Sequence, residues 1–247
     1  MASIATVTEP PNRPEPVASA WHTVGFLALM FGGVALQVLR IVPFRVHTRA
    51  QLYAFTIAFE FLMVVYVWGL GLRPRGKTLR DLIGGKWNNP AAVLMDIAIA
   101  ILFGMIVIFV LLVLNYALGP NPAAARALKV MGPQNARDAF GWILVSSTAG
   151  FCEEFLFRGY FQRQLAALTG HVGFAVPLQA IIFGLGHLYQ GWKGAVAITV
   201  YGTMFGALAV MRKSLRPGML QHAGYDSFVG VTALLLTKYN RWPPGLL

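Results

Sequence analysis

Long apolar stretches separated by short polar connections dominate the chain. Each stretch approaches the roughly 20 apolar residues that a helix needs to cross a bilayer. The pattern predicts an all-α, polytopic bundle of transmembrane helices with about seven spans, and counts of six or eight also fit it. The predicted spans cover residues 22–41, 51–72, 91–118, 139–168, 172–189, 194–212 and 217–237.

The same pattern divides the chain into four regions. Residues 1–20 are rich in proline and contain no apolar core, so we expect a flexible N-terminal tail. Residues 21–118 hold the first three predicted spans. Residues 119–138 are rich in Pro, Ala and charge and indicate a loop with a short interfacial helix near 123–130. Residues 139–238 hold the remaining spans and form the predicted catalytic core.

Composition strengthens the membrane interpretation. The chain is 57% hydrophobic and 12% charged, whereas a soluble domain carries about 25% charged residues. The net charge of +11 gathers in the connections, which suits anionic lipid headgroups as partners. No basic helix or basic patch interleaved with aromatic residues is present, so we expect no nucleic-acid partner. The basic connections 73–86 and 212–216 fall on one side of the predicted bundle, and the positive-inside rule places both, with the N-terminal tail, in the cytoplasm.

Three charged residues interrupt the apolar run 149–158, namely Glu153, Glu154 and Arg158. A charged side chain near the bilayer centre costs about 2.5–3.5 kcal/mol, so such residues usually face a partner or a wet cavity. Glu154 and Arg158 have the i,i+4 spacing that favours an ion pair. Glu153 is rotated about 100° from Glu154 on a helix. We therefore expect Glu154 to be structural and Glu153 to be available to a histidine, a water or a metal.

Two further polar pairs lie in the later apolar stretches. His187 follows Phe183, and Asp226 follows His222, each at an i,i+4 spacing that stacks both side chains on one helix face. Together with Glu153 these residues contain the chemistry that peptide hydrolysis needs. A carboxylate can take a proton from water, and imidazoles, or a metal that they hold, can stabilise the resulting oxyanion. No evident nucleophile accompanies them, which favours direct attack by water.

The three ordered motifs resemble those of the CPBP family of intramembrane proteases. This family includes the type II CAAX prenyl endopeptidases and the bacteriocin-processing and immunity-type bacterial members. The motifs are Glu-Glu-x-x-x-Arg at 153–158, Phe-x-x-x-His at 183–187 and His-x-x-x-Asp at 222–226. The resemblance covers roughly residues 91–237 and rests on the order and spacing of all three motifs.

The resemblance implies a role for each motif residue. Glu153 takes the place of the glutamate that activates water, and His187 and His222 take the places of the essential histidines. Asp226 stands where members carry Asn or another small polar residue. An aspartate suits metal ligation, so His187, His222, Asp226 and Glu153 are candidate ligands of a zinc ion. A metal-free mechanism stays open, and Glu154, Arg158 and Phe183 are expected to support the site.

These observations predict a CAAX-protease-like intramembrane endopeptidase that cleaves a membrane-associated protein or peptide. A multi-pass protein of the bacterial inner membrane is expected. The alternative is a catalytically idle immunity or scaffold protein that uses the same polar cluster to bind a partner. A proton-coupled transporter would predict inverted internal repeats, which the sequence lacks. Glu60 has no motif around it, so we expect it to pack between helices or face headgroups.

Overall fold

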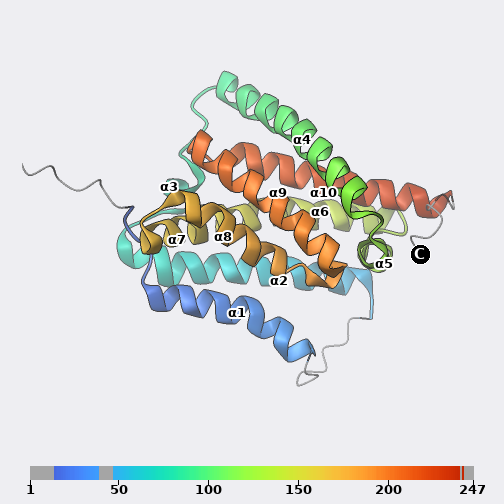
Figure 1. The fold of residues 1–247 in the computed structure, drawn as a ribbon, viewed down its shortest axis with the longest axis horizontal. Helices are drawn as coiled ribbons and strands as arrows, with labels where there is room; N and C mark the ends of the chain where they lie inside the picture. The colour runs from blue at the N-terminus through green and yellow to red at the C-terminus, as the bar shows by residue number, and fades with distance from the viewer. Residues whose placement is uncertain (1–13, 39–46, 240, 242–247) are drawn as a thin grey trace, which may run out of the picture.

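A computed structural model describes residues 14–38, 47–239 and 241. Most of the predicted tail, and the end of the first predicted span, lie outside the described residues. Every secondary-structure element in the described part of the chain is helical (Figure 1). The main helices are α1 Ala20–Val38, α2 Arg49–Tyr66, α3 Leu79–Ile83, α4 Pro90–Leu118, α5 Pro122–Met131, α6 Ala136–Glu153, α7 Gln162–Thr169, α8 Val172–Leu185, α9 Gly191–Arg212 and α10 Arg216–Lys238.

Short segments of other helix types extend or join these helices. The π-helical segments are η1 Val67–Leu72 after α2 and η3 Glu154–Phe161 between α6 and α7. The 3-10 segments are η2 Arg73–Arg75 and η4 Leu188–Gln190. The chain from 136 to 169 is thus one continuous helical stretch, as predicted.

The structure confirms the predicted fold class, an all-α membrane bundle in which about seven spans fit the long helices. Three stretches of the described chain are long and apolar enough to cross a membrane by length and composition, namely Arg49–Arg75, Pro90–Leu118 and Leu188–Arg212. Two shorter apolar helices cover Ala20–Gly32 and Val172–Leu185. The stretch 136–169 and α10 carry the polar residues of the three motifs, which lowers their hydropathy.

Helix starts follow local capping chemistry. Thr48 forms a capping box with Gln51 at the start of α2. Asn89 accepts a hydrogen bond from the backbone N–H of Ala92 and is followed by Pro90, which is a favoured first helical residue. Asn135 caps α6 in the same way by accepting from the N–H of Asp138. These caps fix where three of the long helices begin.

The helices pack around the stretch 136–169. α2 and α10 both pack against α6, while α8 packs against α9 and α7. α4 lies at the edge of the bundle (Figure 1) and exposes large apolar side chains such as Leu102, Phe109 and Leu112. Such a face suits lipid rather than water. The buried core includes the aromatic residues Phe26, Phe155, Tyr160, Phe161 and Phe205.

The basic connections 73–86 and 212–216 meet at one end of the bundle, as the sequence predicts. The backbone N–H of Leu215 donates to the carbonyl of Ile83 at 2.9 Å. Arg163, from α7, donates to the carbonyl of Leu82 at 2.9 Å. These contacts place the start of α10, the α3 segment and α7 together.

The expectation of a flexible tail is wrong for the described residues at its end. Val17 and Ala18 are buried, and their backbone N–H groups donate to Oε1 of Gln164 at 3.0 and 3.1 Å. Gln164 Nε2 returns a hydrogen bond to the carbonyl of Ala18 at 2.9 Å. A buried amide side chain needs such partners, so the segment is bound to α7.

Candidate active site

The first motif lies where the long central helix changes type. Glu153 is the last residue of α6 and Glu154 is the first of the π-helical segment η3. All eight residues of η3 are buried. Short π-helical segments are frequent at functional sites because they shift the directions in which successive side chains point.

Small residues let α10 approach α6 closely. A Cβ atom added to Gly150 would lie 2.7 Å from the backbone nitrogen of Ala223, and Gly230 lies against the Trp142 ring. The Trp142 Nε1–H donates to the backbone carbonyl of Asp226 at 2.8 Å. This packing brings the third motif, on α10, beside the first.

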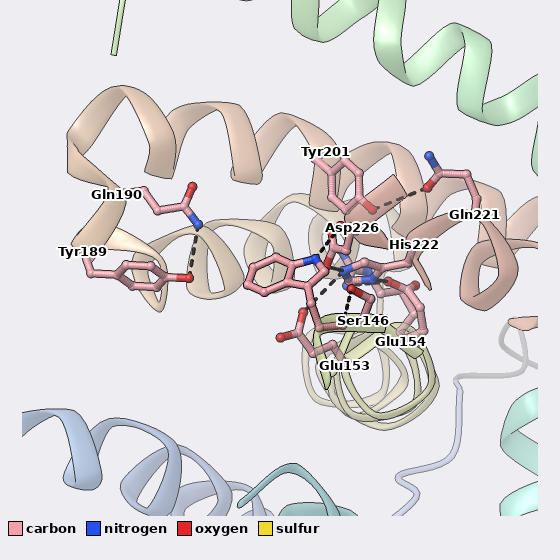
Figure 2. Close-up of polar contacts among 11 residues, drawn as sticks. Ser146, Glu153, Glu154, Tyr189, Gln190, Tyr201, Gln221, His222 and Asp226 are labelled. Atoms are coloured by element: carbon pink, nitrogen blue, oxygen red, sulfur yellow. Dashed lines mark hydrogen bonds and ion pairs between the residues drawn. The ribbon is translucent and has the colours of Figure 1, made fainter. Parts of the chain in front are cut away.

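His222 is the centre of the cluster shown in Figure 2. Its Nδ1 lies 3.0 Å from Glu154 Oε1. Its Nε2 lies 3.5 Å from Asp226 Oδ2 and 3.7 Å from Glu153 Oε2. Arg158 Nη1 donates to Glu154 Oε1 at 3.0 Å, so the predicted i,i+4 ion pair is present. Two motifs that are far apart in the sequence therefore form one polar cluster.

Access to solvent differs sharply within the cluster. The side chains of Glu154 and His222 are 2% and 5% exposed, whereas those of Glu153 and Asp226 are 21% and 34% exposed. The Glu153 carboxylate is therefore partly open to the surroundings of the bundle, while Glu154 is closed off. The two adjacent glutamates occupy different surroundings, as their helical phase predicted.

Aromatic rings surround the buried side of the cluster. The Arg158 guanidinium carbon lies 4.5 Å from the centre of the Phe183 ring and 5.5 Å from that of Phe205. The rings of Tyr201 and Phe205, on α9, lie 5.4 and 5.7 Å from the His222 imidazole. These contacts hold Arg158 and His222 in fixed positions and exclude lipid and water from their side of the site.

His187 lies apart from this cluster. α8 ends at Leu185, and His187 follows in the turn before η4. Its ring packs against Phe183 with 4.8 Å between ring centres, as their spacing predicted, and its Nδ1 lies 2.9 Å from the Phe183 carbonyl. It interacts electrostatically with Glu153. No hydrogen bond or ion pair joins His187 to the three carboxylates in the part of the chain that the structure describes.

Glu154 has a second partner that its sequence position did not indicate. The expectation was that Glu154 would only neutralise Arg158, but the same Oε1 also contacts His222. This contact joins residues on two helices, so no i,i+4 spacing could reveal it. Glu154 thus links the Arg158 charge to the imidazole of the cluster.

Glu60 is a residue near the site that the sequence did not assign to it. It lies on α2 and is 8% exposed, and it interacts electrostatically with Glu153, His222 and Asp226. Of the two expectations for Glu60, its burial agrees with packing between helices and not with facing headgroups. The only signal in the sequence was the presence of a carboxylate inside an apolar span.

The positions of the four candidate ligands decide whether they could bind one zinc ion. His187, His222, Asp226 and Glu153 are chemically suitable for zinc. Among the described residues, however, no group of three or more His, Cys, Asp or Glu side chains is arranged to hold a metal ion. In particular, His187 is turned toward the backbone of its own helix. The arrangement as it stands does not fit a zinc site.

The chain was compared with known proteins. Residues 135–228 match a family model described as "Type II CAAX prenyl endopeptidase Rce1-like". No curated protein and no solved structure matches the chain. The matched segment begins at the cap of α6 and ends two residues after Asp226, so it contains all three motifs. The recognition of a CPBP-type protein is therefore confirmed over residues 135–228, the part of the chain that is similar to the type II CAAX prenyl endopeptidase Rce1-like family.

Proposed function

We propose that the chain is an intramembrane endopeptidase of the CAAX-protease type, in which Glu153 activates the water that attacks a peptide bond. The substrate would be a membrane-associated protein or peptide. The observation that carries the proposal is the contrast between Glu153, whose side chain is partly exposed, and Glu154, which is buried between Arg158 and His222. This contrast lies inside the matched segment 135–228.

The proposed reaction uses only side chains of the cluster. Glu153 removes a proton from water, and the water oxygen attacks the carbonyl carbon of the scissile bond. In its protonated form His222 donates from both ring nitrogens, with Nδ1 directed at Glu154 and Nε2 free to stabilise the oxyanion. When the intermediate collapses, the C–N bond breaks and Glu153 returns the proton to the leaving amine.

Glu154 and Arg158 would support this step without touching the substrate. Glu154 Oε1 holds His222 Nδ1 at 3.0 Å, and Arg158 holds the same oxygen at 3.0 Å. Fixing one ring nitrogen sets the direction of the other, because the imidazole is rigid. Asp226 Oδ2 lies 3.5 Å from Nε2 on the more open side, and Nε2 would leave this contact to donate to the oxyanion. Because no three of the described His, Cys, Asp or Glu side chains are arranged to hold a metal ion, we assign no step to zinc.

The family name suggests the substrates to test. We include prenylated peptides that end in a CAAX sequence, as well as unprenylated peptides, since processing of a bacterial peptide is equally compatible with the cluster.

Because the family includes bacterial members, we extend the proposal to the bacterial inner membrane as the location. A catalytically idle scaffold or immunity protein is the alternative, and it would bind a partner through the cluster without cleaving it.

The decisive experiment measures cleavage by the purified full-length protein. Quenched fluorescent peptides, prenylated and unprenylated, are incubated with the wild type and with Glu153→Gln in lipid nanodiscs. We expect cleavage by the wild type and no cleavage by the variant at equal folded concentration. If no peptide of a broad library is cleaved by the wild type, or if Glu153→Gln cleaves equally well, the proposal is wrong and the scaffold alternative is favoured.

A further inference from the structure

Glu60 presents a buried carboxylate oxygen that has no partner. Its side chain is 8% exposed and lies on α2 among the core residues Met63, Val64 and Val67. Its Oε2 has no hydrogen-bond partner among the described residues. Buried polar atoms are nearly always paired, so each exception in a native structure needs an explanation.

The packing of α2 against α6 indicates which part of the molecule Glu60 faces. α2 and α6 begin at the same end of the bundle, where Arg49 donates to the Gly132 carbonyl at 2.9 Å. Tyr53, seven residues before Glu60, packs its ring edge-on against Trp142 of α6. Seven residues are two helical turns, so Glu60 lies on the same face of α2, two turns further toward Glu153.

Electrostatic contacts agree with this placement. Glu60 interacts with Glu153, His222 and Asp226, and with Cys152 beside Glu153. Together with the packing of α2 on α6, these interactions place Glu60 on the side of α2 that faces the polar cluster. α2 lies outside residues 135–228, so the carboxylate belongs to a part of the chain beyond the family match.

The other carboxylates of the cluster already have partners in the protein. Glu154 contacts both Arg158 and His222, and the oxygens of Glu153 and Asp226 lie near His222 Nε2. A peptide that enters an apolar site brings backbone N–H groups, which need acceptors because no bulk water is present to satisfy them. Glu60 Oε2 is an unpaired acceptor for such a donor, and the bound peptide would have to displace the side chains that now bury it.

We propose that Glu60 is a substrate-binding residue of this site and that its free oxygen accepts a hydrogen bond from a backbone N–H of the bound peptide. The inference rests on the proposed endopeptidase function and adds a specificity-determining contact from α2. It gives a reason for an unpaired carboxylate oxygen at a buried position.

Steady-state kinetics of three variants test this contact. Glu60→Leu removes the acceptor, so we expect KM to rise about tenfold while kcat stays within about twofold, because the variant cannot form the proposed hydrogen bond when the peptide binds. Glu60→Gln keeps one acceptor oxygen and should raise KM about threefold. Glu60→Asp keeps a carboxylate on a shorter side chain, so its KM should lie between the wild-type value and that of Glu60→Leu. The control Thr56→Val removes a polar group one turn away, whose hydroxyl bonds to its own helix, and should leave KM unchanged.

A substrate series makes the test specific. Each backbone N–H near the scissile bond is replaced in turn by an ester oxygen, which cannot donate. At one position the ester should raise KM for the wild type. The same ester should not raise KM further for Glu60→Leu, because the ester and the substitution remove the same hydrogen bond. Additive losses at every position would overturn the proposal, as would unchanged KM in all three variants.

The outcomes separate this inference from the proposed function. Failure of the wild type to cleave the all-amide peptide would refute the endopeptidase proposal itself. Cleavage by the wild type without coupling between Glu60 and any ester position would refute only the role of Glu60. Should Glu60→Leu not fold, the same ester series with Glu60→Gln and Glu60→Asp gives the answer.

Discussion

The adjacent residues Glu153 and Glu154 differ in their surroundings and in their proposed roles. Their side chains leave the helix in different directions, and α10 covers only one of them completely. Glu154 contacts Arg158 and His222, and these partners stabilise its charge in the membrane interior, where an unpaired charge is costly. Glu153 keeps an oxygen on the accessible side, where a substrate and a water can approach.

Replacement of each glutamate by glutamine should therefore have different consequences. Glu153→Gln should abolish peptide cleavage, since the amide cannot take the proton, while thermal stability in detergent stays near the wild-type value. Glu154→Gln should lower stability by about 3–5 kcal/mol, because removing one partner of a buried pair leaves Arg158 and His222 without their carboxylate. Thermal unfolding and cleavage measured on the same samples check both outcomes. Equal loss of activity at unchanged stability in both variants would contradict this division.

Asp226 distinguishes catalysis with a metal from catalysis without one. In the metal-free reaction its oxygen only accepts a hydrogen bond from His222 Nε2, and asparagine also offers an oxygen. We therefore expect Asp226→Asn to retain activity within about threefold, with no gain from added zinc. A large loss of activity that excess zinc reverses would instead support the zinc ligands expected from the sequence, because a neutral amide is a poorer ligand than a carboxylate. Elemental analysis of the wild type is the matching control.

Residue spacing could predict contacts within one helix and little beyond it. The pairing of Glu154 with Arg158 and the packing of Phe183 on His187 both follow from i,i+4 geometry. The contact of His222 with Glu154 depends on how α10 packs on α6, which spacing does not encode. Glu60 was expected only to pack between helices or face headgroups for the same reason, since no local motif connects α2 with the later helices.

At the scale of helices, the site depends on the close approach of α6 and α10. Gly150 permits it, because a Cβ atom there would lie 2.8 Å from the Met219 carbonyl oxygen and 2.7 Å from the Ala223 nitrogen. Backbone atoms cannot move aside like the end of a flexible side chain. Any group larger than hydrogen at Gly150 must therefore push the helices apart and move His222 away from Glu154.

A matched pair of glycine substitutions tests this dependence. Gly150→Ala should lower stability by about 1–3 kcal/mol through overpacking and should reduce kcat at least tenfold. Gly224→Ala is the control on α10, since nothing lies within 4 Å of a Cβ atom at Gly224. It should keep full activity and gain slightly in stability, because alanine favours helix. Thermal unfolding and cleavage rates of both variants check the expectation, and equal activity of the two would contradict it.

Hydrophobic periodicity predicted the long helices well but not their local irregularities. The boundaries of α4 and α9 follow apolar runs that end at glycine, proline or charge. The π-helical segments η1 and η3 have no comparable pattern, because both helix types bury the same apolar residues. The bound segment at Val17 was also missed, since its order comes from a single distant glutamine, Gln164.

Two short connections rich in Lys and Arg lie at the same end of the molecule. The connections 73–86 and 212–216 meet there through the hydrogen bond between Leu215 and Ile83, and the segment around Val17 binds α7 at the same end. The α6 cap lies at the other end, since α4 crosses the bundle between α3 and α5 (Figure 1). The basic residues of the two connections are Arg73, Arg75, Lys77, Arg80, Lys86, Arg212, Lys213 and Arg216.

The two basic connections predict the orientation of the protein in the membrane. Short connections rich in Lys and Arg stay in the cytoplasm, so Arg80 should lie inside and Arg137, at the start of α6, should lie outside. The native Cys152 is buried, which allows Arg80→Cys and Arg137→Cys to report accessibility, with Cys152→Ala as background. An impermeant thiol reagent added to intact spheroplasts should label Arg137→Cys at once and Arg80→Cys only after permeabilisation. The reverse result would invert the orientation, and labelling of both from one side would show that α4 does not span the membrane.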